Sequence, residues 1–311
     1  METKIMTIFT RTPLHVGAGS SVGAVDQPVI RERHTRFPII PGSAIKGVLA
    51  DAWKDELIER TRGEGDEQNV SLVRPDKDQD KEISWLFGNE DANNAATGAL
   101  LLGEARLFAF PVRSARGGFA WLTCPLALQR AVRDGLLASD VLENLSELKD
   151  DQAWFTKEIF GIKNGEGASE GVFEDQPLKH TDEIPDVLKN ALKKILSSAD
   201  PIARTMPERI VIVSTGMLAY FVTTACEVAQ HVKINDVTGT ASAGALFNQE
   251  NVPAETFFYA VLNAIDSRNR NKTAGDAMKA LKAKLKKVSG IFQFGSDAST
   301  GLGYCTVTLN E

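Results

Sequence analysis

The stretch over residues 14–47 reads Leu14-His15-Val16-Gly17-Ala18-Gly19-Ser20-Ser21-Val22-Gly23-Ala24-Val25-Asp26-Gln27-Pro28-Val29-Ile30 and then, after a charged segment, Phe37-Pro38-Ile39-Ile40-Pro41-Gly42-Ser43-Ala44-Ile45-Lys46-Gly47. Its first block is a glycine-rich loop that follows a strand, and glycines let backbone amides approach an anion closely. Its second block is a Pro-Gly turn that leads into a helix. We expect Ser43 to cap that helix, so that free N–H groups face an anion. The stretch therefore predicts a site that holds a phosphate backbone, with Asp26 available for chemistry.

The composition is that of an ordinary soluble protein. The 311 residues, 43% hydrophobic and 24% charged, suffice for one large domain or two ordinary ones. No apolar run is long enough to span a membrane, so we expect no membrane partner. Three separated cysteines without a CxxC pattern predict buried, reduced thiols in the cytoplasm. The net charge of −6 weighs against a non-specific nucleic-acid binder, but it is compatible with RNA bound in a local groove.

The order of the predicted elements is that of an α+β protein. Apolar patterns predict strands over 4–10, 99–110, 118–123, 210–214, 256–265 and 304–309, and helices over 43–60, 125–150, 186–198, 217–229 and 274–288. This order fits an RRM-like or ferredoxin-like core with long insertions rather than a doubly wound sheet. A hairpin is predicted over 231–247. Acidic stretches without apolar periodicity predict irregular polar insertions over 61–82 and 161–186.

Several motifs, in one order along most of the chain, carry a family resemblance. They are His15–Gly19, Asp26–Pro28, Arg31–Thr35, Pro38–Gly47, Gly103–Ser114, Gly118–Pro125, Gly244–Phe247, Pro253–Tyr259 and the glycine-rich loop Phe294–Gly303. Together they resemble the RAMP backbone subunits of type III CRISPR effector complexes, most closely the fourth-subunit family of the type III-B (Cmr) module. The resemblance implies a single RAMP domain over 1–311, in which residues 231–252 form a thumb-like hairpin.

The resemblance also implies a function. Members of this family stack with other copies of themselves into a helical filament along a CRISPR guide RNA, beside other type III effector subunits, and cleave the paired target RNA at regular intervals. Asp26 matches the loop aspartate that promotes attack by the 2′-OH, with a divalent metal, Mg²⁺ or Mn²⁺, at Asp26. His15 is a second catalytic candidate. Cmr relatives often carry a Glu and a Tyr after the hairpin, where this chain reads Gln249-Glu250-Asn251, so Glu250 is a candidate substitute.

The candidates for RNA contact are cations and residues of the glycine loops and the helix start. They are Gly17, Gly19, Arg31, Arg33, His34, Ser43, Lys46, Arg113, Arg116, Gly295, Ser299, Thr300 and Gly301. Each has an ordinary alternative, because charged segments are usually solvated and glycine loops often only connect strands. The C-terminal loop is neither a P-loop, since no GxxxxGK[ST] pattern exists, nor a dinucleotide fingerprint, since it leads into a strand.

Other functions stay open on the sequence. The first is a non-cleaving, structural guide-binding backbone, which the segment around Gln249 leaves open. The second is a metal-independent RAMP endoribonuclease that processes the guide, with His15 as general acid–base; cleavage of a precursor hairpin in EDTA would indicate it. A small-molecule enzyme is disfavoured, because the chain has no cofactor motif.

Overall fold

The computed structural model describes residues 1–19, 25–53, 58–62, 69–73, 81–89, 96–143, 145, 147–163, 165, 169–196, 200–235, 238–267 and 271–310. The strands are β1 (Glu2–Thr10), β2 (Ile39–Ile40), β3 (Ile58–Arg62), β4 (Asn69–Val73), β5 (Gly88–Asn89), β6 (Ala96–Thr97), β7 (Leu100–Leu102), β8 (Ala105–Ser114), β9 (Gly118–Thr123), β10 (Gln152–Trp154), β11 (Ile162–Lys163), β12 (Ser169–Phe173), β13 (Gln176–Asp182), β14 (Ile210–Val213), β15 (Glu227–Ile234), β16 (Ala241–Asn251), β17 (Phe257–Ala264), β18 (Ile291–Gln293) and β19 (Tyr304–Asn310). The helices are α1 (Gly42–Ala52), α2 (Lys81–Phe87), α3 (Pro125–Arg133), α4 (Lys157–Phe160), α5 (Asp186–Ile195), α6 (Met206–Arg209), α7 (Thr215–Thr224) and α8 (Ala274–Lys287), with 3₁₀ helices η1 (Ser139–Leu142), η2 (Ala203–Thr205) and η3 (Ala298–Thr300).

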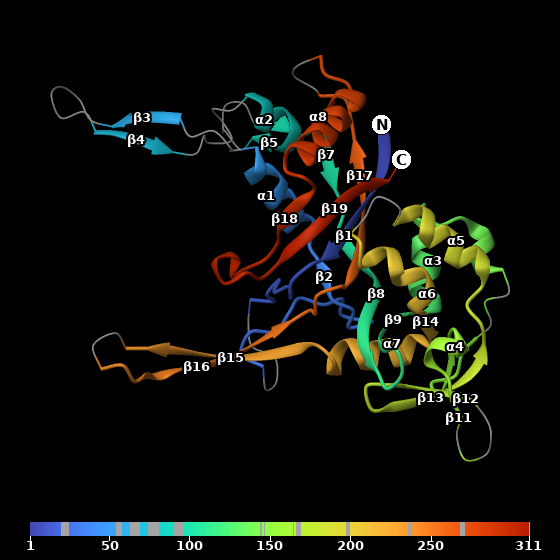
Figure 1. The fold of residues 1–311 in the computed structure, drawn as a ribbon. Coiled ribbons are helices and arrows are strands. Elements are labelled where there is room, and N and C mark those ends of the chain that lie inside the picture. Colours follow the sequence, from blue (N-terminus) through green and yellow to red (C-terminus); the bar gives the residue numbers. More distant parts are fainter. Residues whose placement is uncertain are drawn as a thin grey trace.

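Most strands belong to one mixed sheet (Figure 1). Its order is β11-β12-β13-β10-β14-β9-β8-β17-β1-β19-β18, with β2 beside β8 and β7 beside β17. At its centre, β19, β1, β17 and β8 are antiparallel neighbours. The chain is therefore a mixed α/β protein, in agreement with the α+β pattern of the sequence.

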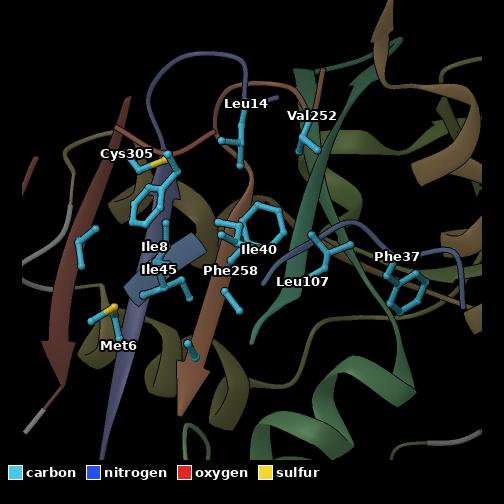
Figure 2. Packing of buried hydrophobic residues seen from close by; sticks show 14 of the residues in the cluster. Met6, Ile8, Leu14, Phe37, Ile40, Ile45, Leu107, Val252, Phe258 and Cys305 are labelled. Atoms are coloured by element: carbon cyan, nitrogen blue, oxygen red, sulfur yellow. The ribbon is translucent and has the colours of Figure 1, made fainter. Parts of the chain in front are cut away.

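Two hydrophobic cores lie on the two faces of the central strands. Met6 and Ile8 of β1 pack in a core with Ile45 of α1, which Figure 2 shows. Phe9 packs in the other core, which contains Trp121 of β9. Successive side chains of a strand point to opposite faces of the sheet. Because β1 is buried from Ile5 to Thr10, its side chains pack in both cores.

The helix after the Pro-Gly turn differs from its prediction at both ends. Pro41 is the N-cap of α1, and no side chain caps the helix, so Ser43 lies inside the first turn and does not cap it. An N-cap side chain reaches the free N–H groups only from the residue before the helix, and here that residue is Pro41. The helix ends at Ala52, and Ile58–Arg62 forms β3 instead of the predicted last turn.

The two segments expected to be irregular contain strands. Within 61–82, β4 pairs with β3, and α2 begins at Lys81; residues 63–68 and 74–80 lie outside the described residues. Within 161–186, β12 pairs with both β11 and β13, and Phe173 and Leu178 are buried; residues 164 and 166–168 are outside the description. The prediction of irregular structure was wrong because strand pairing uses backbone groups, which an acidic composition does not reveal.

The hairpin of β15 and β16 extends away from the body of the molecule, as the orange arrows of Figure 1 show. Its antiparallel register runs from Glu227 opposite Asn251 to Ile234 opposite Ala241. The predicted hairpin over 231–247 thus exists with longer strands, and α7 ends earlier than expected, at Thr224. Residues 236–237 lie outside the described residues. In the described part of the chain, no helix combines the length and apolar character that crossing a membrane requires.

Candidate nucleic-acid interface

Separate segments of the chain meet at the base of the β15–β16 hairpin: the loop after β1, residues 25–31, the end of β16 and the loop 294–303. Their common anchor is a short pairing of Leu14 with Val252, in which each backbone N–H donates to the other's carbonyl oxygen, at 2.8 and 2.9 Å. Both side chains are buried and belong to the core of Figure 2. Apolar packing thus determines where the neighbouring His15 and Asn251 lie.

Asp26 is exposed and lies against the outer edge of β16. Its backbone N–H donates to Asn248 Oδ1 at 2.7 Å, and its own Oδ2 accepts the backbone N–H of Asn248 at 2.9 Å. The next residue, Gln27, pairs in parallel with Gln249. Among the residues that the structure describes, no hydrogen-bond donor contacts Asp26 Oδ1. One carboxylate oxygen is therefore held and the other is available.

Glu250 and Arg31 form a buried ion pair below Asp26. Arg31 Nη2 lies 2.6 Å from Glu250 Oε1, and their side chains are only 7% and 10% exposed. The backbone N–H of Val29 donates to Glu250 Oε2 at 3.0 Å. Arg31 also donates to the Arg36 carbonyl at 2.9 Å and to Cys226 Sγ at 3.2 Å. Burial raises the pKa of the Cys226 thiol to about 12, so this sulfur stays a neutral partner.

Because of this ion pair, the RNA contact expected of Arg31 stays a prediction without geometric support. Its guanidinium is directed inward because a buried Glu250 without a cation would cost several kcal/mol, on the order of 3–5. Both oxygens of Glu250 are likewise occupied by protein groups. The geometry therefore favours a structural role for Glu250, and its catalytic role stays a prediction without geometric support.

His15 is buried and is held by backbone groups. Its Nδ1 lies 2.6 Å from the Glu250 carbonyl oxygen, and its own carbonyl accepts the N–H of Ser296 at 3.0 Å. A Cβ at Gly17 would lie 3.0 Å from His15 Nε2, and one at Gly295 would lie 2.0 Å from the His15 carbonyl oxygen. Gly295 is thus required by close packing against the His15 backbone, and Gly17 fits closely against the His15 ring. RNA contact stays a prediction for both glycines.

Asp297 joins the glycine-rich loop to the hairpin. Its Oδ2 accepts the Ser296 hydroxyl at 2.5 Å and the Gln249 amide at 3.0 Å. Gln249 is 2% exposed and also donates to Asn251 Oδ1. The hydrogen bond from Ser296, followed by that from Gln249, holds the pKa of Asp297 below its ordinary value. Sequence reasoning missed Asp297 and Asn248; the signal for the latter was the run of amide side chains at the end of β16.

Most of the other residues predicted to contact RNA are exposed. Ser299 and Thr300 form the exposed η3, and Gly19 and Gly301 have φ values of 86° and 89°, in the left-handed region that glycine adopts readily. Arg33, His34, Ser43 and Lys46 are also exposed. His34 has a protein partner, since its Nε2 lies 3.1 Å from Arg130 Nη2. RNA can reach the exposed side chains of Arg33, Ser43, Lys46, Ser299 and Thr300. RNA contact stays a prediction for all of these positions.

Arg113 and Arg116 belong to a different region. Arg113 Nε pairs with Glu174 Oε2 at 2.8 Å, and Arg116 donates to the Gly161 carbonyl. Both contacts tie the β8–β9 turn to the segment 161–174. The contacts of Arg113 and Arg116 thus support a structural role for both side chains, and their contact with RNA stays a prediction.

Comparisons with known proteins find relatives over the whole length of the chain. The sequence pattern of the RAMP superfamily matches residues 7–306. The protein described as CRISPR system Cmr endoribonuclease Cmr4, from Pyrococcus furiosus, is 30% identical over 317 residues, which cover 100% of this chain and 97% of that protein. The crystal structure of oligomeric Cmr4 from the same organism covers 100% of this chain and 98% of its own, with a TM-score of 0.67 and 25% identity. A chain of the type III-B Cmr-beta complex bound to cognate target RNA has the same fold, with a TM-score of 0.66, 17% identity and coverage of 99% and 97%.

Proposed function

The chain belongs to the RAMP superfamily, and from this premise we propose that it is a repeated backbone subunit of a CRISPR ribonucleoprotein that binds guide RNA and cleaves the paired target RNA. One observation carries the proposal: an exposed carboxylate, Asp26, is held by one oxygen at the base of a protruding hairpin. Full-length similarity to a protein described as an endoribonuclease supports it.

The strand order supports a ferredoxin-like core with long insertions. In sequence order, β1, α1, β8, β17, α8 and β19 give the sheet order β19-β1-β17-β8 with antiparallel neighbours, which is that of a βαββαβ unit. The β15–β16 hairpin is inserted before β17. We assign it the role of a thumb-like element within a single domain over 1–311.

Asp26 would act on the RNA directly. Its Oδ1 accepts the proton of a ribose 2′-OH, and the 2′-oxygen attacks the adjacent phosphorus. The bond from phosphorus to the 5′-oxygen then breaks, and that oxygen takes a proton from water. The products are a 2′,3′-cyclic phosphate and a 5′-hydroxyl end.

A divalent cation fits this site only as an open one. Among the described residues, no group of three or more His, Cys, Asp or Glu side chains is placed to hold a metal. Mg²⁺ is commonly bound through one or two carboxylates and completed by phosphates and water. Asp26 Oδ1 would provide the carboxylate, as an alternative to its role as the base, and RNA would provide the phosphates. A bound Mg²⁺ or Mn²⁺ would neutralise charge on the phosphate.

The RNA partners would be read by shape and by base pairing. Exposed Arg33 and the loop of Ser299 and Thr300 would contact phosphates and 2′-hydroxyls, which carry no sequence information. Copies that pack head to tail, as in a heterologous interface, would form a filament along the guide, with other type III subunits at its ends. The cytoplasmic location expected from the sequence is part of the same proposal.

The test is cleavage of a labelled, guide-complementary RNA by the reconstituted complex, in Mg²⁺ and in EDTA. We expect regularly spaced products from wild type in Mg²⁺. Asp26→Ala should bind the target equally well and cleave about 10²–10⁴-fold more slowly, whereas Asp186→Ala, which removes an exposed carboxylate on α5, should match wild type.

Two outcomes would replace this proposal by an alternative. Target binding without cleavage by wild type would indicate the non-cleaving backbone. Cleavage that persists in EDTA, on a precursor hairpin instead of a paired target, would indicate guide processing with His15 as general acid–base.

A further inference from the structure

We propose that Asn248 is the positioning residue of Asp26: it holds Oδ2 so that Oδ1 is the oxygen that meets the RNA. The inference rests on the proposed cleavage of target RNA and deepens it, by naming the residue that orients the reactive carboxylate and the oxygen that reacts.

The contact between the two residues is reciprocal. Asn248 offers its side-chain oxygen to the backbone N–H of Asp26 at 2.7 Å, and its backbone N–H to Asp26 Oδ2 at 2.9 Å. The first bond fixes the main chain at Asp26 and the second fixes its carboxylate. A hydrogen bond from a backbone N–H to a carboxylate is charge-assisted and stronger than a neutral one. An exposed aspartate that would otherwise rotate is therefore held in one orientation.

The backbone hydrogen bonds around Asn248 show how the segment of Asp26 binds to the edge of β16 that faces away from β15. The N–H of Gln27 donates to the Asn248 carbonyl at 3.1 Å, and the N–H of Glu250 donates to the Gln27 carbonyl at 2.9 Å. The backbone groups of Asn248 and Glu250 therefore point away from β15, and the segment that carries Asp26 lies on this edge as a short third strand. Because the segment is bonded to β16, the position of Asp26 follows the hairpin.

The residue type matters at position 248. Asparagine has a side-chain acceptor short enough to reach a neighbouring backbone N–H without carrying charge. Alanine would leave the N–H of Asp26 without this acceptor. The backbone N–H that donates to Asp26 Oδ2 is kept by any residue at position 248, so Asn248→Ala removes only the side-chain acceptor. Aspartate has the same shape and keeps that acceptor, so recovery of the rate in Asn248→Asp assigns the loss in Asn248→Ala to this hydrogen bond.

The test uses the reconstituted complex with guide RNA and labelled target, and measures the single-turnover cleavage rate and the target Kd separately. Asn248→Ala should cleave about 10–100-fold more slowly, because small misplacements of a reacting group cost rates of this order, while the Kd stays within about twofold of wild type. Asn248→Asp should recover most of the rate. The control Asn190→Ala, at an exposed position on α5, should match wild type in both measurements.

A double variant tests whether Asn248 acts through Asp26. Asp26→Ala/Asn248→Ala should cleave no more slowly than Asp26→Ala alone, because the positioning residue then has nothing to position. An Asn248→Ala complex that cleaves at the wild-type rate, or one whose rate falls only in proportion to target affinity, overturns the inference and leaves the proposed function intact. A wild-type complex that binds target and never cleaves overturns both.

Discussion

Removal of the Arg31 side chain should destabilise the protein strongly without weakening RNA contact. In Arg31→Ala, the Glu250 carboxylate, which is 10% exposed in the wild-type structure, loses the cation that lies 2.6 Å from it and keeps only the N–H of Val29. Breaking a buried ion pair by removing one partner costs about 3–5 kcal/mol. For a chain of this length, that corresponds to a fall in Tm of roughly 5–8 °C.

The matched control is Arg113→Ala. Arg113 also pairs with a glutamate, at 2.8 Å, but its side chain is 81% exposed, so its loss should change the free energy of unfolding by about 0–1 kcal/mol. The double variant Arg31→Met/Glu250→Met removes both buried charges. It should be more stable than Arg31→Ala, because no unpaired charge remains and the main residual cost is the unpaired N–H of Val29, about 1–3 kcal/mol.

The assay is urea unfolding of the isolated chain followed by circular dichroism, with guide-RNA affinity measured for the assembled complex. Equal costs for Arg31→Ala and Arg113→Ala would show that burial does not govern the Arg31 pair. A loss of guide affinity in Arg31→Ala at unchanged stability would refute the inward assignment and restore Arg31 to the RNA interface.

Three further predictions concern other parts of the chain. Burial raises the pKa values of Cys226 and Cys305. At pH 8, both thiols of the folded protein should therefore react with a disulfide reagent at least about tenfold more slowly than those of the urea-unfolded protein. Fast reaction in the native state would contradict this prediction. Thr273→Ala should cost about 1 kcal/mol in urea unfolding because Thr273 caps α8 in a capping box, whereas Ser43→Ala should cost less than about 0.5 kcal/mol; equal costs would contradict the cap assignment. The pKa of Asp297 is lowered in the folded protein, so its charged form stabilises the folded state at pH values above the ordinary aspartate pKa of 3.8, and this contribution is lost as the pH falls through the folded pKa. The difference in unfolding free energy between wild type and Asp297→Asn should therefore shrink below about pH 4. A difference that is constant with pH would refute this prediction.

Much of the fold could be predicted because apolar periodicity reports burial directly. The strand at Ile210–Val213 and the helix at Ala274–Lys287 agree closely with their patterns. The errors fall where periodicity is weak. Residues 58–60 were assigned to a helix, and the acidic segment 161–186 was expected to be irregular, because pairing with a partner strand is a property of the backbone that the residue types hardly indicate.

The candidate site likewise has parts that the sequence predicts and parts that it does not. The loop with Asp26 and the glycine-rich loop stand out in the sequence, since glycines and an isolated aspartate are local signals. The assignment of Arg31 and Glu250 to a buried ion pair has no local signal, because the two residues are 219 positions apart. From the sequence alone, two charged side chains are expected to be exposed to solvent. Their burial is tolerated only because the fold places the two opposite charges next to each other.

The sequence by itself thus determined the class of fold, the order of its central elements and the loop that carries Asp26, because each of these depends on residues that are close along the chain. The tertiary structure alone decided which oxygen of Asp26 is available and which residue holds it. Asn248 lies 222 positions from Asp26, and the packing of Leu14 against Val252 brings their segments together. Hydrogen bonds act over about 3 Å, so a partner so distant in sequence is specified only by the packed core.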